Sequence, residues 1–162
     1  MKRIKLRQDG SMKYVLDNSH AAEWTVGDII ADYNAKHSPY FEKRLGSDDD
    51  GYGKENYQLL VYSDSCFVGG AIFYVQYEWL TLELLGFKPS YTHCGIGTKV
   101  MELLETFAKE HNLYGIKLDT WDFQAKDFYI KNGFYVWGEF KDCPPGTITY
   151  FMRKDLRKDT DV

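Results

Sequence analysis

A short glycine-rich segment between an apolar run and an amphipathic stretch constrains this chain more than any other feature. Residues 91–99 read Tyr-Thr-His-Cys-Gly-Ile-Gly-Thr-Lys. The apolar run 80–87 comes before them, and residues 100–111 repeat apolar side chains at helical spacing. This order predicts a strand, a glycine loop and a helix whose N-terminus presents free backbone N–H groups to a phosphate. Because Gly95 and Gly97 lack a Cβ, the backbone can turn tightly and approach an anion closely.

Two common phosphate-binding motifs do not match this segment. In the dinucleotide-binding fingerprint the third glycine would fall at Val100. A Walker loop requires Gly-Lys followed by Ser or Thr after four free positions, whereas here Thr98 precedes Lys99. Two glycines before a helix also occur in plain loops, so the rest of the chain has to decide between the readings.

Composition limits the class of protein. The 162 residues suit one domain over residues 1–162, and the net charge of −4 argues against a general nucleic-acid partner. No apolar run approaches the roughly 18 residues of a membrane span, and the basic N-terminus lacks the apolar region of a signal peptide. Cys66, Cys94 and Cys143 lie far apart, which suits a reducing cytoplasm and offers no metal-ligand spacing. We therefore expect a soluble cytoplasmic protein that uses no metal.

Apolar periodicity and turn residues predict the order of the elements. We expect a strand or hairpin near the N-terminus, six later strands and three helices. The strands fall at residues 4–16, 57–62, 66–77, 79–87, 115–120, 134–140 and 147–153, and the helices at 25–45 (broken near Pro39), 100–111 and 125–132. On the second helix the predicted apolar face contains Val100, Leu103, Leu104, Phe107 and His111. This order predicts a mixed α+β sheet.

Three segments together resemble the GNAT superfamily of N-acetyltransferases. Residues 91–97 resemble its pyrophosphate loop, usually Gln/Arg-x-x-Gly-x-Gly/Ala, and residues 82–89 resemble its central strand. Residues 128–134 resemble its Phe-Tyr-x-Lys-x-Gly-Phe signature, and the likeness runs from about Tyr57 to Leu156. It implies an α+β fold with a mixed, mostly antiparallel central sheet flanked by helices and a splayed central strand pair. One departure is Thr92, where the family usually has Arg or Gln.

The resemblance also implies a site for acetyl-CoA as co-substrate. Strand 82–87 would splay from strand 117–120, and a bulge at Gly86 would help its freed backbone groups to bind the acetyl carbonyl and the pantetheine arm. The glycine loop would hold the pyrophosphate, where Thr98 can add a hydroxyl and a protonated His93 can compensate for Thr92. The implied coenzyme-binding residues are Leu85, Gly86, Phe87, Thr92, His93, Cys94, Gly95, Ile96, Gly97, Thr98 and Phe128.

Two residues are candidates for catalysis. The resemblance places Tyr129 near the coenzyme sulfur, where its hydroxyl, protonated at neutral pH, would act as general acid; a purely core position is the alternative. Glu83 is the candidate general base, because a carboxylate in an apolar strand is costly to bury without a purpose; a solvated face or a salt bridge is the alternative. Glu78 and Asp119 are in reserve. Cys94 at a helix N-terminus also permits a rival mechanism through an acetylated thiol.

These residues predict an N-acetyltransferase that moves an acetyl group from acetyl-CoA to a primary amine by direct transfer in a ternary complex. The expected acceptor is a small molecule, such as an aminoglycoside-like or streptothricin-like compound, a polyamine or an amino-acid derivative. The alternatives are a non-catalytic acyl-CoA-binding or sensing module and an acetyltransferase of protein N-termini or lysines. We expect neither nucleic acid nor membrane as a partner, and a homodimer stays open. The N-terminal quarter and the polar loop 46–53 are expected to shape the acceptor pocket.

Overall fold

The computed structural model describes the chain in four stretches, residues 4–9, 12–16, 23–44 and 53–157. The chain divides into two compact units, one within residues 1–51 and the other within residues 52–162. The expectation that the whole chain forms a single domain stays a prediction. The polar loop that we expect near the acceptor lies, up to residue 52, outside the described residues.

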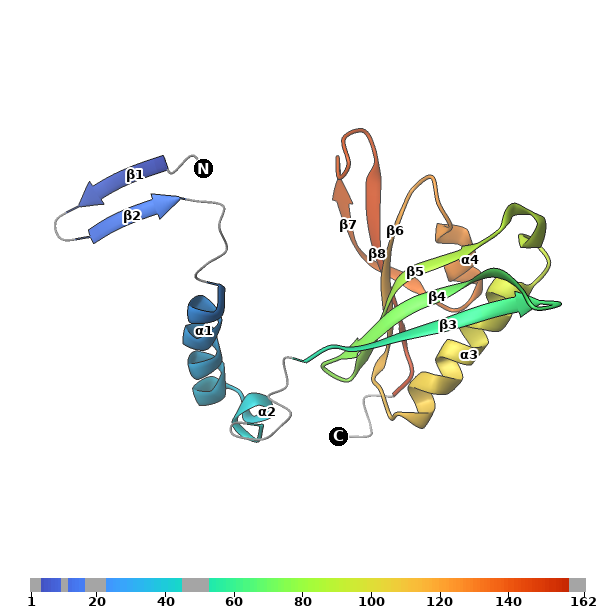
Figure 1. Ribbon diagram of the computed structural model, residues 1–162, viewed down its shortest axis with the longest axis horizontal. Helices are drawn as coiled ribbons and strands as arrows, with labels where there is room; N and C mark the ends of the chain where they lie inside the picture. Colours follow the sequence, from blue (N-terminus) through green and yellow to red (C-terminus); the bar gives the residue numbers. More distant parts are fainter. Residues whose placement is uncertain (1–3, 10–11, 17–22, 45–52, 158–162) are drawn as a thin grey trace. The chain divides into compact units, whose positions relative to one another are not determined.

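The first unit contains a hairpin and two helices (Figure 1). Strand β1 (Ile4–Asp9) pairs with β2 (Met12–Leu16) in antiparallel fashion, which confirms the predicted hairpin. Helix α1 (Glu23–His37) ends before Ser38, and α2 (Pro39–Glu42) begins at the proline. Ser38 is extended because a residue before proline avoids the helical region, so the predicted break occurs there.

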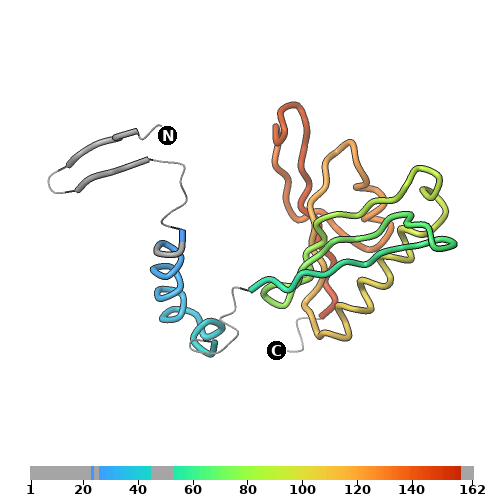
Figure 2. The backbone as a smooth tube through the Cα atoms, viewed as in Figure 1, coloured from blue at the N-terminus to red at the C-terminus, as the bar shows by residue number. Residues whose placement is uncertain are grey.

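The second unit is a six-stranded sheet with two helices (Figures 1 and 2). The strands run in the order β3-β4-β5-β6-β8-β7, and all neighbours are antiparallel except β5 and β6. The elements are β3 (Glu55–Ser63), β4 (Cys66–Gln76), β5 (Trp79–Phe87), a 3-10 turn η1 (Pro89–Tyr91), α3 (Ile96–Glu110), β6 (Gly115–Trp121), α4 (Lys126–Lys131), β7 (Tyr135–Lys141) and β8 (Ile148–Asp155). This architecture confirms the predicted fold class, and the predicted strands begin and end within one or two residues of the observed ones.

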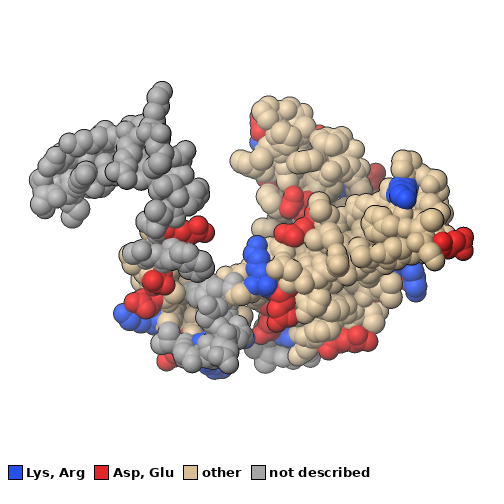
Figure 3. Space-filling view, in the orientation of Figure 1, with Lys and Arg blue, Asp and Glu red and all other residues tan. Residues whose placement is uncertain are grey.

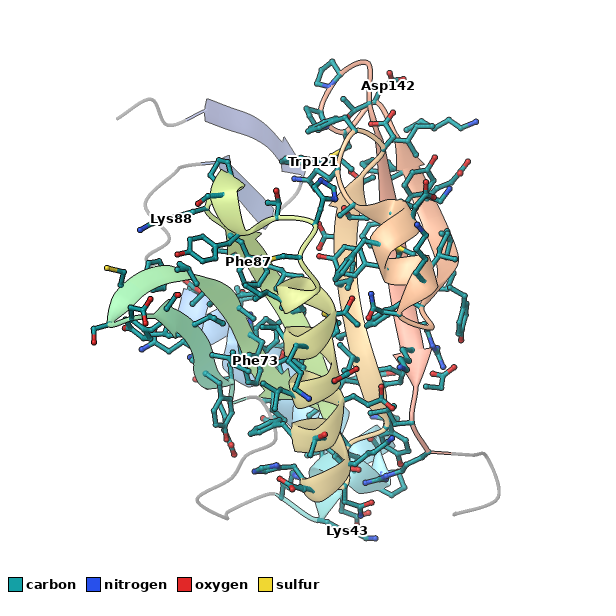
Figure 4. The ribbon with its side chains drawn as sticks, turned by 90° about the vertical axis from the view of Figure 1, so that its right-hand side faces the viewer. Lys43, Phe73, Phe87, Lys88, Trp121 and Asp142 are labelled. Atoms are coloured by element: carbon teal, nitrogen blue, oxygen red, sulfur yellow. The ribbon has the colours of Figure 1, made fainter. Side chains whose placement is uncertain are left out.

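One layer of apolar side chains between α3 and the sheet forms the core. Leu80 on β5, Leu104 on α3, Ile116 on β6 and Met152 on β8 are all at most 1% exposed. In Figure 4, α3 lies across one face of the sheet, and Phe73 on β4 points toward it. Burial of this layer removes apolar surface from water and holds the parallel pair β5 and β6 beneath the crossover helix.

Two local predictions need correction. On α3 the buried face contains Val100, Met101, Leu104 and Ala108, whereas Leu103 is 45% exposed. The helix is therefore rotated slightly from the predicted apolar stripe. On β5 the bulge is at Glu83 and not at Gly86, because Ile72 of β4 pairs with Leu84 while Phe73 pairs with Leu82. The extra residue between two ladder partners is the mark of a bulge.

Candidate active site

The central strands β5 and β6 diverge halfway along their length. They pair in parallel from Trp79 and Gly115 up to Leu82 and Leu118, and the pairing ends there. Beyond this point β5 continues beside β4 as far as Phe87, and β6 continues beside β8 as far as Trp121. Figure 4 labels Phe87 and Trp121, the last residues of the two strands. This divergence confirms the predicted splayed pair, and among the described residues one edge of β5 is left without a strand partner.

Backbone alternation indicates which groups of β5 face the opening. The N–H of Lys88 donates to the carbonyl of Val68 on β4 at 2.8 Å. Because successive N–H groups along a strand point to opposite sides, those of Phe87 and Leu85 point away from β4. The predicted backbone donors of the site are therefore on the edge that β6 has left.

A cavity of about 750 Å³ adjoins this edge. Residues from β5, from the loop before α3 and from the segment 122–131 line it, together with one residue of β8. They are Leu85, Gly86, Phe87, Tyr91, Thr92, His93, Gly95, Gly97, Thr98, Asp122, Gln124, Ala125, Lys126, Asp127, Phe128, Tyr129, Lys131 and Tyr150. The structure thus brings most of the predicted coenzyme-binding residues together around one space. Cys94, Ile96 and Glu83 are not among its lining residues.

The N-terminus of α3 opens toward this cavity. Gly95, the N-cap, has φ of 84°, a left-handed conformation that glycine adopts without strain. Lys99 N–H donates to the Gly95 carbonyl at 3.0 Å, so the N–H groups of residues 96–98 precede the first bond of the helix. A Cβ on Gly97 would lie 3.2 Å from the Phe128 ring, so glycine here also lets α3 approach α4 closely.

Side chains of the preceding loop mostly bond to the loop itself. The Thr92 hydroxyl donates to the Pro89 carbonyl at 2.8 Å, and the Cys94 thiol donates to the Tyr91 carbonyl at 3.0 Å. Cys94 is exposed and lies outside the cavity lining. The loop therefore offers backbone groups and His93, rather than a thiol, to the cavity.

Tyr129 combines burial with access to the cavity. Its side chain is 8% exposed and packs edge-on against Phe128 and Phe134, yet it lines the cavity. Burial raises the pKa of its hydroxyl to about 12, and the negative charge of Asp119 adds to the increase. The hydroxyl consequently keeps its proton at neutral pH and is chemically suited to donate it.

Glu83 does not occupy the buried position that the sequence suggested. It is exposed, on the face of β5 opposite the buried Leu80 and Leu82. The expectation that burial makes it a better base is wrong. Glu78, the first reserve candidate for the base, forms an ion pair with Arg157 at 3.3 Å. It directly precedes β5, at the end of the strand away from the opening. Asp119, the other reserve residue, follows directly after the last paired residue of β6.

Sequence reasoning missed one part of the cavity, which is lined by Asp122, Gln124, Ala125, Lys126, Asp127, Lys131 and Tyr150. Lys126 lies over the Tyr150 ring, with its Nζ 3.8 Å from the ring centroid. The Gln124 side-chain oxygen accepts from the Trp121 N–H and from the Thr120 hydroxyl, each at 3.1 Å, which fixes the turn between β6 and α4. Lys126, two residues before the signature 128–134, and Lys131 within it were a signal for an anionic ligand.

The described residues also give information on metal ligands, membrane-spanning helices and surface charge. Over the stretches that the structure covers, no group of three or more His, Cys, Asp or Glu side chains is placed to hold a metal ion. Among the same residues, no helix combines enough length and apolar character to cross a membrane. On the face of the molecule in Figure 3, basic and acidic side chains of the described residues are interspersed.

Comparison with known proteins identifies the class. The family model for the acetyltransferase (GNAT) family matches residues 16–134, and the chain belongs to this family. A blasticidin-S acetyltransferase of Streptomyces morookaense is 33% identical over 89 residues, which are 54% of this chain and 65% of that protein. This chain thus matches less than two thirds of the length of that relative.

Solved structures share the fold. An acetyltransferase from Bacillus cereus ATCC 14579 has a TM-score of 0.73 and 25% identity, over 89% of this chain and 98% of that one. PaiA N-acetyltransferase from Thermoplasma acidophilum, solved in complex with coenzyme A, has a TM-score of 0.56 and 20% identity, over 85% of this chain and 84% of that one.

Proposed function

We propose that this protein transfers the acetyl group of acetyl-CoA to a primary amine of a small molecule, directly and within a ternary complex. The observation that carries the proposal is the cavity that joins the α3 N-terminus, the unpaired edge of β5 and Tyr129. Membership of the acetyltransferase (GNAT) family and the coenzyme A complex of the Thermoplasma acidophilum neighbour support it.

The coenzyme is held mainly by backbone. Its pyrophosphate lies at the N-terminus of α3, where the N–H groups of residues 96–98 and the helix dipole favour negative charge. Its pantetheine arm follows the free edge of β5 and bonds Leu85 and Phe87. Lys126 and Lys131 at the cavity add positive charge for the phosphates, which offsets the missing cation at Thr92.

The chemistry then needs a neutral amine, a polarised carbonyl and a proton for the thiolate. The amine nitrogen, after losing one proton to a base, forms the C–N bond to the thioester carbon. A backbone N–H on β5 stabilises the oxyanion; removing such a donor costs about 3–4 kcal/mol in enzymes that depend on it. When the C–S bond breaks, the thiolate takes the proton of Tyr129, and the surplus proton on nitrogen restores the tyrosine.

Glu83 as the base stays a prediction, now for an exposed carboxylate. Glu83→Gln should lower turnover mainly below the pKa of the amine, since the base is needed only while the amine is protonated. The pH–rate profile is the measurement. An acidic limb that matches the wild type in position and height assigns the base elsewhere or to water.

The acceptor belongs to the class of small cationic amines. The Streptomyces morookaense relative is named for blasticidin S, which makes antibiotic amines the first class to examine. Streptothricin, spermidine and L-lysine extend the panel to the other small-molecule classes. A peptide with a free N-terminus and an internal lysine tests whether the acceptor is instead a protein.

The decisive experiment measures coenzyme binding and coenzyme A release together. Acetyl-CoA affinity is determined by calorimetry, and thiol release is then followed with each amine of the panel. Gly97→Val places a branched side chain against Phe128 and into the cavity, so acetyl-CoA affinity should be lost. Gly138→Val is the control, because a Cβ there meets only ordinary contacts with Phe151 at 3.7 Å, outside the cavity.

Each outcome has a distinct meaning. Undiminished acetyl-CoA affinity in folded Gly97→Val contradicts the placement of the coenzyme. Tight coenzyme binding by the wild type without release for any amine or peptide supports the non-catalytic binding module instead.

A further inference from the structure

Asp119 lies where β5 and β6 diverge, and it has no part in the proposed binding of the coenzyme. It follows Leu118, the last residue of β6 that pairs with β5. Leu118 and Thr120 are 5% and 4% exposed and face the α3 side of the sheet, where Leu118 joins the core. Because side chains alternate along a strand, Asp119 and Trp121 lie on the opposite face, and both are exposed.

Tyr129 lies near the same opening and belongs to helix α4. It packs in the core layer and lines the cavity. The Asp119 carboxylate nevertheless acts on its hydroxyl, since its charge contributes to the raised pKa of Tyr129. Both residues are thus at the divergence of the strands: Asp119 directly follows the last residue of β6 that pairs with β5, and Tyr129 lines the cavity beside Leu85 and Phe87 of β5.

Other charged groups near this point have different surroundings. Asp122, Lys126, Asp127 and Lys131 line the coenzyme cavity, which Asp119 does not. On the face of the sheet that carries Asp119, Arg153 is bonded to Asp155, and Lys117 lies further down β6. Glu83 is exposed on β5 at the bulge. Within the described residues the Asp119 carboxylate has no hydrogen bond or ion pair, so its charge is available to a ligand.

We infer that Asp119 binds the ammonium group of the acceptor at the opening between β5 and β6 and thereby selects cationic amines. The inference rests on the proposed function, because it assumes that the thioester lies at this opening. Trp121, two residues further on the same face, stacks on Phe123 with ring centroids 5.4 Å apart and offers an exposed apolar wall beside the carboxylate. The favoured acceptor is accordingly an amine carried on a flat or apolar group.

Besides burial, which is the larger cause, the same carboxylate raises the pKa of Tyr129. A negative charge near the hydroxyl opposes a second negative charge, so the ammonium site and part of the pKa increase of Tyr129 depend on one residue. An Asp119 substitution should therefore alter two quantities, the KM of the amine and the pKa of Tyr129. A residue with a merely structural role would change neither in a folded protein.

The experiment compares Asp119→Asn with Glu110→Gln, which removes one exposed carboxylate at the far end of α3. Blasticidin S, spermidine and L-lysine are the acceptors. Asp119→Asn should raise the KM of the best acceptor by roughly 10- to 100-fold, the usual range for one charge-assisted bond, while acetyl-CoA affinity is unchanged. Asp119→Glu should recover part of the loss. Added salt should raise the KM of the wild type more than that of Asp119→Asn.

The second readout does not require turnover. NMR of ¹³C-tyrosine-labelled protein, with the Tyr129 signal assigned from Tyr129→Phe, follows the hydroxyl titration. The pKa of Tyr129 should fall in Asp119→Asn and stay high in Glu110→Gln. An unchanged pKa contradicts the proximity of the two groups.

Different results would overturn the proposed function and the role of Asp119. A wild type that acetylates no acceptor overturns the proposed function. An active enzyme in which Asp119→Asn leaves the KM unchanged overturns this inference alone. The same holds if the KM increase appears in Glu83→Gln instead, because the ammonium site would then be on β5.

Discussion

The residues of β5 up to Leu82 pair with strands on both sides, whereas those after it pair only with β4. The side chains change face at the bulge between the two parts. Leu80 in the first half is fully buried, while Leu84 in the second half is 65% exposed. Both are leucines in one strand of nine residues, and the bulge at Glu83 turns Leu84 to the face opposite Leu80 while Leu85 returns to the core side.

This comparison shows how one strand can hold the fold together and also form a site. In the first half, hydrogen bonds and apolar contacts satisfy the backbone and stabilise the core. In the second half, the departure of β6 leaves N–H groups for a ligand and opens the cavity. The two halves should therefore respond oppositely to substitution, with loss of stability in one and loss of activity in the other.

The largest effect is expected for the hydroxyl at the opening. Tyr129→Phe keeps the ring that packs against Phe128 and Phe134 and removes only the proton donor. The kcat should fall roughly 10²- to 10⁴-fold with little change in acetyl-CoA affinity. An acyl donor with a more acidic thiol should reduce the defect. If Tyr129→Phe turns over at the wild-type rate while chemistry limits that rate, Tyr129 is not the general acid and has only a packing role.

A pair of leucine truncations tests the two halves of β5 directly. Leu80→Ala leaves a cavity in the core and should lower the free energy of unfolding by about 2–5 kcal/mol. Leu84→Ala, at an exposed position, should change it by less than about 0.5 kcal/mol. Urea unfolding curves measure both. Similar losses for the two variants would contradict the change of face at the Glu83 bulge.

The buried hydroxyl should also appear in the pH dependence of stability. The pKa of Tyr129 rises from 10.0 to about 12 on folding, chiefly because of burial. Between these values the unfolded chain has lost the proton and the folded chain has kept it, so stability present below pH 10 is lost as the pH rises toward 12.

The measurement is the difference in unfolding free energy between the wild type and Tyr129→Phe. As the pH rises from 10 to about 12, the wild type should lose roughly 2–3 kcal/mol of unfolding free energy relative to Tyr129→Phe. The comparison of variants cancels the titration of other groups. Parallel curves would mean that the hydroxyl is not desolvated in the folded protein.

The sequence predicted the fold class because its periodic segments are long and its turns carry clear signals. The turn at Asp64 and Ser65 has positive φ at both residues, and Gly146 has φ of 79°, as its turn requires. Prediction from the sequence failed for features that depend on how neighbouring strands pair. The bulge at Glu83 is set by the register of β5 against β4, which no residue of β5 reveals alone.

The site shows the same limit. The glycine loop and Tyr129 were found because local motifs carry them. Asp122, Gln124 and Tyr150 line the cavity only because tertiary structure brings the end of β6, the start of α4 and β8 together. The importance of Asp119 likewise depends on where β6 stops pairing with β5, a boundary that the alternation of its side chains does not mark.

The smallest expected effect concerns Thr92, at the other end of the coenzyme cavity from the opening. Its backbone is extended, with φ of −81° and ψ of 156°, so any side chain fits there without strain. Thr92→Arg gives up the hydroxyl bond to the Pro89 carbonyl and adds a cation at the cavity wall. An exposed pair of this kind contributes about 0.2–1 kcal/mol, so acetyl-CoA affinity should increase by at most about fivefold at low salt.

Thr92→Gln is the matched control, because it lengthens the side chain without adding charge. The gain of Thr92→Arg over Thr92→Gln should shrink as salt is added, since salt screens a charge in contact with solvent. Calorimetric titration of acetyl-CoA at two ionic strengths measures this. Equal affinities for the two variants at low salt would show that residue 92 does not face the phosphates. In that case Lys126 and Lys131, which also line the cavity, are the remaining candidates for the positive charge that this loop lacks.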